Sequence, residues 1–320
     1  MTNVLLIGDI HLSDTPPVSC TESYTDDLFD LLAHTVTLAR EHNAVTVWAG
    51  DIFHIKGPTR NSHALVQRTI DIIQSYPNGN IYVVPGNHDL SNDRLESIDS
   101  QPLGVLFKAG ARYLKGWAGE AGPDFPIYGV PWLQRFTDVS VPSALAEYRR
   151  LAGHEDHALV VTHAPLYPPG KELPYENYPA SKWADAMGNT GSVFYGHVHD
   201  FHGVYSVEGT KFCNNGSLSR GALTESHLTR DVVATLWSSV NGEFKTLPLP
   251  YRPSSEVFRV EEINTKKAAK VQLDDFLKSV GYATMEMTNV DSVMEYIRTL
   301  SLGEEIEAMI SSLLNEVSIG

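Results

Sequence analysis

The sequence predicts an α/β protein, and three observations carry that prediction. Apolar, strand-like runs alternate with amphipathic helical patterns through the first third of the chain. The connections between them are short, which favours right-handed β-α-β units. Four runs also stop at a glycine that is followed by polar residues. These runs are residues 4–11 (VLLIGDIH), 45–54 (VTVWAGDIFH), 81–89 (IYVVPGNHD) and 192–199 (SVFYGHVH), and residues 158–163 (ALVVTH) form a fifth that lacks only the glycine.

The first third is expected to run strand, helix, strand, helix, strand. After the strand at residues 4–8, residues 25–42 have apolar side chains at helical spacing, and residues 62–75 repeat that pattern. The strand at residues 45–49 separates the two helices. A turn at Pro77-Asn78-Gly79 then leads into the strand at residues 81–84.

The rest of the first 250 residues is less regular and becomes mostly β. We expect helices at residues 102–110 and 143–151, with strands at residues 126–130, 158–162 and 192–195. Two hairpins follow, one joining residues 204–207 to 211–214 and one joining 232–237 to 243–247 around Asn241-Gly242. Residues 167–187 are rich in proline and tyrosine and are predicted to be a loop that lines a substrate cleft.

A proline-rich stretch at residues 247–253 predicts a domain boundary. Residues 1–252 would form one large domain, and residues 253–320 a small helical extension. Three short amphipathic helices are expected in that extension. Their apolar faces either pack on the core and on one another or form a surface for dimerisation or partner docking.

Composition limits the function classes. The formal net charge is -15, and no basic face is visible, so a long nucleic-acid duplex would find little to hold it outside a local cationic site. The two cysteines are too few for a disulfide framework. We see no secretory leader and no apolar run long enough for a membrane span, and we therefore expect a cytoplasmic protein with no membrane partner.

The polar residues after the strands are metal-ligand types. Asp9 and His11 are two positions apart, as are His197 and His199, so each pair projects to one side of an extended chain. Carboxylate, amide and imidazole groups together suit manganese, iron or zinc better than calcium or magnesium. Because ligands gather at the carboxyl ends of strands, we expect these groups to meet at one site.

These motifs resemble the calcineurin-like metallophosphoesterase family over roughly residues 1–250. The resemblance rests on GDIH at residues 8–11, GDIFH at 50–54, GNHD at 86–89, the lone His163 and GHVH at 196–199. GDIFH followed by Pro58 is similar to the SbcD-type exonucleases and the nuclease subunit of double-strand-break-repair complexes. That closer resemblance implies a DNA exonuclease or endonuclease.

The family resemblance implies two mixed β-sheets sandwiched between helices, with two divalent metal ions. Mn²⁺ is the expected metal, with iron or zinc as alternatives. Asp51 would be shared between the two ions. One ion would be held by Asp9, His11, Asp51 and His199, and the other by Asp51, Asn87, His163 and His197.

The resemblance also implies catalytic side chains. His88 would bind the phosphate or protonate the leaving oxygen, and Asp89 would either orient His88 or be purely structural. His54 would be a second imidazole that faces the substrate. Contacts with substrate phosphates are expected from Arg60, Ser217 and Arg220. The histidines outside the motifs, His34, His42, His63, His154, His157 and His227, are expected to be surface or helix residues.

Three functions remain open at this level. The first is a phosphodiesterase that cleaves DNA, and the second is a phosphodiesterase for small 2',3'-cyclic nucleotides, which suits the acidic chain. The third is a metal-binding interaction module without turnover. The partners that go with these readings are the phosphodiester substrate and either a second copy of the chain or an SMC-like ATPase.

Overall fold

The computed structural model describes residues 2–57, 60–79, 81–118, 126–151, 158–171, 177–222, 224–261 and 264–265. The chain divides into two compact units, Met1–Phe258 and Arg259–Gly320. Residues 253–258, which follow the predicted boundary, belong to the first unit, where Phe258 pairs with Cys20. The three helices predicted for the C-terminal extension lie outside the described residues. Within those residues no helix has the length and apolarity that a membrane crossing requires.

The first sheet has six strands in the order β14-β13-β1-β2-β3-β4. Strands β1 to β4 run parallel to one another, whereas β13 is antiparallel to both of its neighbours. Its strands are β1 (Asn3–Ile7), β2 (Ala44–Trp48), β3 (Ile81–Val83), β4 (Arg112–Tyr113), β13 (Val233–Ser238) and β14 (Glu243–Pro248).

The second sheet also has six strands, in the order β11-β12-β10-β7-β6-β5. Its central strands β12, β10, β7 and β6 are parallel, and the edge strands β11 and β5 are antiparallel. The prediction of two mixed sheets is therefore confirmed. The strands are β5 (Gly116–Trp117), β6 (Ile127–Val130), β7 (Leu159–His163), β10 (Ser192–Gly196), β11 (Gly203–Val207) and β12 (Thr210–Asn214).

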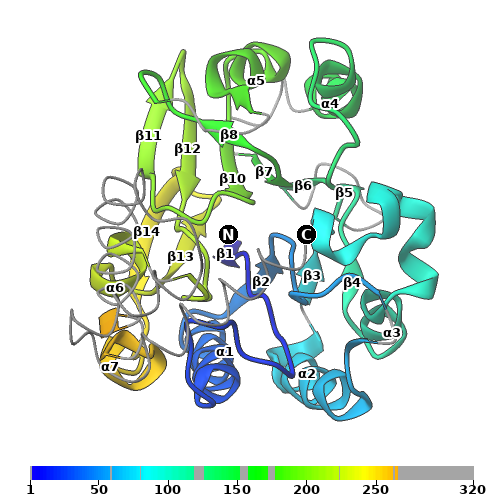
Figure 1. The fold of residues 1–320 in the computed structure, drawn as a ribbon. Helices are drawn as coiled ribbons and strands as arrows, with labels where there is room; N and C mark the ends of the chain where they lie inside the picture. Colours follow the sequence, from blue (N-terminus) through cyan, green and yellow to red (C-terminus); the bar gives the residue numbers. More distant parts are fainter. Residues whose placement is uncertain are drawn as a thin grey trace, which may run out of the picture. The chain divides into compact units, whose positions relative to one another are not determined.

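Helices cover the outer face of each sheet, so the first unit has four layers (Figure 1). Below the first sheet lie α1 (Tyr24–Glu41) and α2 (His63–Ser75), with α3 (Pro102–Lys108) beside α2. Beyond the second sheet lie α4 (Ser140–Leu151) and α5 (Ala180–Met187). Two short helices, α6 (Glu225–Thr229) and α7 (Ser254–Val257), and a small pair of strands, β8 (Leu166–Tyr167) and β9 (Tyr178–Pro179), complete the described α-helices and β-strands.

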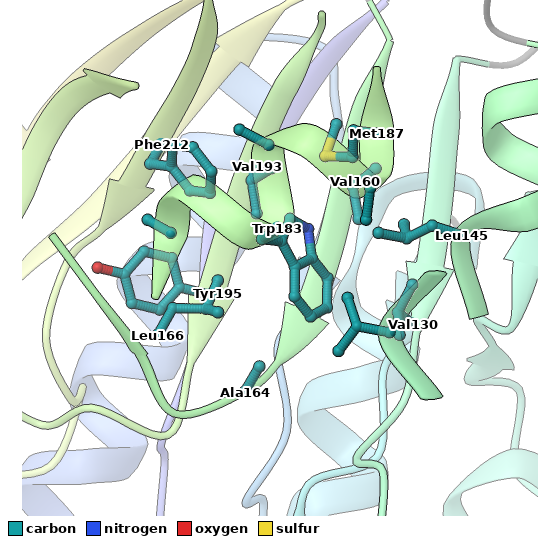
Figure 2. Packing of buried hydrophobic residues seen from close by; sticks show 14 of the residues in the cluster. Val130, Leu145, Val160, Ala164, Leu166, Trp183, Met187, Val193, Tyr195 and Phe212 are labelled. Carbon is teal, nitrogen blue, oxygen red and sulfur yellow. The ribbon is translucent and has the colours of Figure 1, made fainter. Parts of the chain in front are cut away.

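Side-chain alternation along the strands builds two apolar layers. In β7, Leu159 and Val161 join the core between the two sheets, whereas Val160 faces α4 and α5. The outer layer gathers around the fully buried indole of Trp183 from α5, which lies next to Val160 and Val130 (Figure 2). Both faces of the central strands β6, β7 and β10 are buried, as expected for parallel strands. This packing fixes the positions of the strand ends. It therefore also fixes the positions of the polar residues that follow them.

Candidate metal centre

Five strand ends deliver the seven predicted ligands to one place. Strands β1, β2 and β3 are parallel within the first sheet, and β7 and β10 are parallel within the second, so their carboxyl ends lie side by side. Backbone hydrogen bonds join the loops after β1 and β2, because the N–H groups of Asp9 and His11 donate to the carbonyls of Gly50 and Asp51 at 3.1 and 2.9 Å. The residues delivered are Asp9, His11, Asp51, Asn87, His163, His197 and His199.

The first group of ligands consists of Asp9, His11 and His199. The Nε2 atoms of His11 and His199 are 3.0 Å apart. Asp9 Oδ1 lies 3.6 Å from Nε2 of His199 and 4.0 Å from Nε2 of His11. Three ligand atoms from β1 and β10 thus surround one point.

The second group consists of Asp51, His163, His197 and Asn87. Nε2 of His163 lies 3.4 Å from Oδ2 of Asp51. The Asn87 side-chain oxygen is 3.2 Å from Nε2 of His163 and 3.1 Å from Nδ1 of His197. These ligand atoms from β2, β3, β7 and β10 surround a second point.

Asp51 lies between the two groups. Its Oδ2 is 3.7 Å from Nε2 of His11 in the first group and 3.4 Å from Nε2 of His163 in the second. Its Oδ1 accepts the backbone N–H of His88 at 2.8 Å, which fixes the carboxylate plane. One carboxylate that faces both groups is the arrangement that a shared ligand requires.

The distances between the ligand atoms suit bound metal ions better than they suit hydrogen bonds among the ligands. Ligand atoms bound to one ion at about 2.0–2.1 Å lie about 3 Å apart, close to the separations within each group. At most one proton can lie between Nε2 of His11 and Nε2 of His199, so at least one of these two nitrogens presents a lone pair there, as a metal ligand must. His11 Nδ1 is also buried and has no hydrogen-bond partner within the described part of the chain. The mixed oxygen and nitrogen set suits manganese, iron or zinc.

The backbone around the ligands is strained. Asp9, His11, Asp51 and His197 all have left-handed φ angles, of 54°, 51°, 53° and 83°. Such conformations cost of order 1–3 kcal/mol each for non-glycine residues and gather at functional sites. Gly50 has φ of 87°, and a Cβ there would collide with Nδ1 of His163. Only glycine therefore fits at position 50.

The charged side chains in the centre shift one another's pKa values. Burial by itself would raise the pKa of Asp51, but the His163 imidazole beside it holds that pKa well below its usual range. Burial likewise opposes the charged form of His163, yet the Asp51 carboxylate outweighs it and raises the pKa of His163 to about 9. Burial raises the pKa of Asp9 to about 7. Without a metal, His163 and Asp51 therefore form a buried ion pair whose proton a cation must displace.

The remaining ligand histidines are held neutral. Burial lowers the pKa of His197 to about 3, with the neighbouring His163 as the next cause. Burial also keeps the pKa of His11 well below its usual value, although Asp51 opposes this. A neutral imidazole has a lone pair to offer to a metal ion.

His88 and His54 lie beside the first group. The ring centroid of His88 is 5.0 Å from that of His11, and the rings of His54 and His88 are stacked 5.8 Å apart. Nδ1 of His88 lies 2.6 Å from the backbone carbonyl of His54, to which it donates. His88 is partly exposed and His54 is exposed, so both imidazoles reach solvent next to the ligands.

Of the two roles expected for Asp89, the structure favours the structural one. Its carboxylate does not orient the His88 ring. Oδ2 instead accepts the backbone N–H groups of Asp51 and Gly86 at 2.8 and 2.9 Å, and Oδ1 accepts that of Ile52 at 2.9 Å. Asp89 therefore ties the loop after β2 to the loop after β3, and the His54 carbonyl orients His88.

The residues expected to bind substrate phosphates lie in different environments. Arg60 is exposed. Ser217 is buried, and its hydroxyl donates to the carbonyl of Ser219 at 2.5 Å. Arg220 is buried too, and its guanidinium forms an ion pair with Asp27 at 3.1 Å. The structure thus gives Ser217 and Arg220 protein partners instead of an open path to a substrate.

An open cleft of about 630 Å³ leads to the two ligand groups. Trp132 lines it next to His197, with ring centroids 4.8 Å apart, and His227 lines it next to His199. The prediction that residues 167–187 form a loop lining a substrate cleft is wrong for the described residues of that segment, 167–171 and 177–187. Residues 180–187 are helix α5 with Trp183 in the core, and none of the described residues of that segment lines the cleft.

His227 and Trp132 are site residues that the sequence did not reveal. His227 is only 3% exposed, and its ring lies 6.4 Å from that of His199. Burial, followed by the charge of Arg230, lowers the pKa of His227 to about 4. Neither residue belongs to a motif, and the only signal for Trp132 is that a large aromatic residue stands two positions after the end of β6.

Solved structures show distant similarity to this chain. A 5'-nucleotidase from Candida albicans SC5314 aligns over 78% of this chain and 52% of its own, with 14% identity and a TM-score of 0.43. The chain thus spans about half the length of that protein. A hypothetical protein from Pyrococcus horikoshii OT3 aligns over 83% of this chain and 94% of its own, with 11% identity and a TM-score of 0.36. No curated protein sequence matches the chain.

The family model for calcineurin-like phosphoesterases matches residues 2–201, which include all seven ligands, His54 and His88. The match does not distinguish subgroups, so the SbcD-type assignment stays a prediction. The chain belongs to the calcineurin-like phosphoesterase family.

Proposed function

We propose that the chain is a phosphodiesterase that works with two divalent metal ions, with Mn²⁺ as the expected metal. The observation that carries the proposal is the Asp51 carboxylate between two ligand groups, 3.7 Å from His11 Nε2 and 3.4 Å from His163 Nε2. The cleft supports a diester, because its lining extends from the ligands to Trp132, beside His197 of one group, and to His227, beside His199 of the other. Both substituents on the phosphorus then have room.

The two groups would hold the ions as the family resemblance implies. Asp9, His11 and His199 would bind one ion, Asn87, His163 and His197 the other, and Asp51 both. When bound, such ions polarise a phosphoryl group and lower the pKa of water, which supplies a nucleophile at neutral pH.

His88 is placed to handle a proton. Because Nδ1 donates to the His54 carbonyl at 2.6 Å, Nε2 carries the second proton of the imidazolium form. That N–H is the one available to a phosphoryl or leaving-group oxygen. The bond from the His88 backbone to Asp51 Oδ1, at 2.8 Å, keeps the imidazole next to the ligands. His54, stacked on His88, limits the directions in which the ring can turn.

Two substrate classes follow from different observations. The GDIFH motif at residues 50–54 and its likeness to SbcD-type nucleases favour DNA. The charges near the cleft favour a small phosphodiester such as a 2',3'-cyclic nucleotide. Asp200 lines the cleft, and Asp93 and Glu96 line a neighbouring cavity of about 420 Å³ that shares Trp132, with Arg135 as its basic side chain. A polyanion laid across both cavities would meet more carboxylates than cations.

Hydrolysis of bis(p-nitrophenyl) phosphate by the Mn²⁺-loaded protein tests the proposal. We expect turnover in the parent protein and its loss in Asp51→Asn, which weakens both metal groups. His88→Asn should lower kcat by about 10²–10⁴-fold, the usual range for a general acid. His63→Asn, at an exposed position on α2 outside the cleft, is the control and should keep parental kcat.

The outcomes separate the open functions. Parental turnover in Asp51→Asn and His88→Asn would contradict the assigned site. Bound metal without any turnover would support the non-catalytic interaction module. Parallel assays with single-stranded DNA, duplex ends and 2',3'-cyclic nucleotides compare the two substrate classes, and cleavage of the cyclic nucleotides alone would reject the nuclease reading.

A further inference from the structure

His227 is a buried histidine that no motif explains. It comes from α6, after the last strand that contributes ligands, and it lines the cleft together with Ala222 and Thr224. Its ring is nearly parallel to that of His199, at an angle of 25° and a centroid distance of 6.4 Å. The imidazole therefore sits at the edge of the first ligand group.

Hydrogen bonds assign the tautomer of His227. The backbone N–H of Ala222 donates to Nδ1 at 3.2 Å, so Nδ1 presents a lone pair. A proton on Nδ1 would put two donors face to face. The proton of the neutral ring must therefore be on Nε2. The backbone N–H of His227 also donates to the Thr224 hydroxyl at 3.2 Å, which holds the start of α6 in place.

Nε2 of His227 is left available to a ligand. Within the described part of the chain no protein atom hydrogen-bonds to it, and it is not among the buried polar atoms without a partner. The ring thus presents one N–H donor of fixed position where it borders the cleft. A donor that is oriented before substrate arrives costs little reorganisation when negative charge develops nearby.

We propose that His227 binds substrate, with its Nε2–H donating a hydrogen bond to a non-bridging phosphoryl oxygen held beside His199. This proposal rests on the proposed phosphodiesterase function, because it places the phosphoryl group at the two metal ions. His227 complements His88. The free nitrogen of His88 carries a proton only in the imidazolium form, whereas the free nitrogen of His227 carries one in the neutral form.

Two substitutions distinguish substrate binding by His227 from its contact with the backbone at Ala222. In His227→Asn the amide oxygen can still accept the Ala222 N–H, but the donor in the cleft is lost. In His227→Gln a donor can reach the cleft, but the contact with Ala222 is lost. His202→Asn is the matched control, because His202 is partly buried, bonds Tyr195 through Nδ1 at 2.7 Å and does not line the cleft.

Binding of inorganic phosphate to the Mn²⁺-loaded protein, measured by calorimetry, needs no turnover. We expect His227→Asn to weaken binding about 10- to 100-fold, the range for one hydrogen bond to a charged group. His227→Gln should recover part of that loss, and His202→Asn should bind as the parent does. Equal metal content in all four proteins, measured in parallel, shows that the ligand groups remain intact.

The tautomer provides a second readout, on the metal-free protein. Long-range ¹H–¹⁵N spectra of the histidines, assigned with His227→Asn, should show Nε2 protonated and Nδ1 unprotonated. The opposite tautomer, parental phosphate affinity in His227→Asn, or absence of phosphate binding by the parent would each overturn the proposal. If the parent binds phosphate through His227 but hydrolyses no phosphodiester, the proposed function fails and the His227 assignment stands.

Discussion

The substitution Asp89→Asn tests how the two ligand loops are held together. The Asp89 carboxylate is 3% exposed and accepts three backbone N–H groups, from Asp51, Ile52 and Gly86, at 2.8 to 2.9 Å. An asparagine has one acceptor oxygen in place of two. If that oxygen takes the position of Oδ2, it keeps the bonds from Asp51 and Gly86, and the new NH₂ group faces the N–H of Ile52.

The expected cost follows from that geometry. One buried N–H is left without an acceptor and faces another donor, which costs about 1–3 kcal/mol. For a unit of this size, 1 kcal/mol shifts Tm by roughly 2–4 °C, so a loss of about 2 kcal/mol lowers Tm by about 4–8 °C. The freed loop also carries the Asp51 carboxylate, so metal affinity should fall together with stability.

Thermal unfolding, metal titration and amide hydrogen exchange together check this prediction. Exchange at the Ile52 amide should accelerate by about tenfold or more, since 1.4 kcal/mol corresponds to a factor of ten. The control is Asp93→Asn, because Asp93 forms an exposed ion pair with Lys56, which contributes at most about 1 kcal/mol. Parental Tm, metal affinity and Ile52 exchange in Asp89→Asn would refute the reasoning.

Two further predictions concern buried charge. Asp27→Asn removes the only carboxylate paired with the Arg220 guanidinium in the described part of the chain. Because that guanidinium is 1% exposed, we expect a loss of about 3–5 kcal/mol in denaturant unfolding. Asp26→Asn, in an exposed pair, should cost at most about 1 kcal/mol, and equal effects would contradict the burial argument. In the metal-free protein, the pKa of His163 is raised to about 9 beside Asp51, above the ordinary 6.5, so its stabilising protonation is complete below pH 6.5 and is lost as the pH rises towards 9. Tm measured in chelator should fall over that window, and a Tm that rises from pH 6.5 to 9 would be inconsistent with the His163–Asp51 pair.

Local patterns predicted most of the fold in the first 250 residues. The period-3.6 apolar pattern found α1 and α2 within one residue at each end, and Asn241-Gly242 marked the hairpin of β13 and β14. The convergence of the ligands was also predictable, because parallel strands bring their carboxyl ends together whatever their separation in sequence.

Errors arose where long-range partners decide the structure. Prolines at 168, 169, 174 and 179 favoured a loop, yet Pro179 directly precedes α5, where a buried Trp183 ties the helix to the second sheet. Arg220 has the residue type of a phosphate ligand, but its partner Asp27 lies 193 positions away and is invisible to local patterns. His227 follows no motif spacing, and only the folded chain brings it to His199.

The central claim is that one aspartate, Asp51, is shared by two metal ions. Anomalous diffraction from crystals soaked in Mn²⁺ tests it most directly. We predict two peaks per chain, one within coordination distance of Asp9, His11 and His199, the other of Asn87, His163 and His197, and both next to the Asp51 carboxylate. A single peak, or two peaks of which one lies away from Asp51, would contradict the account.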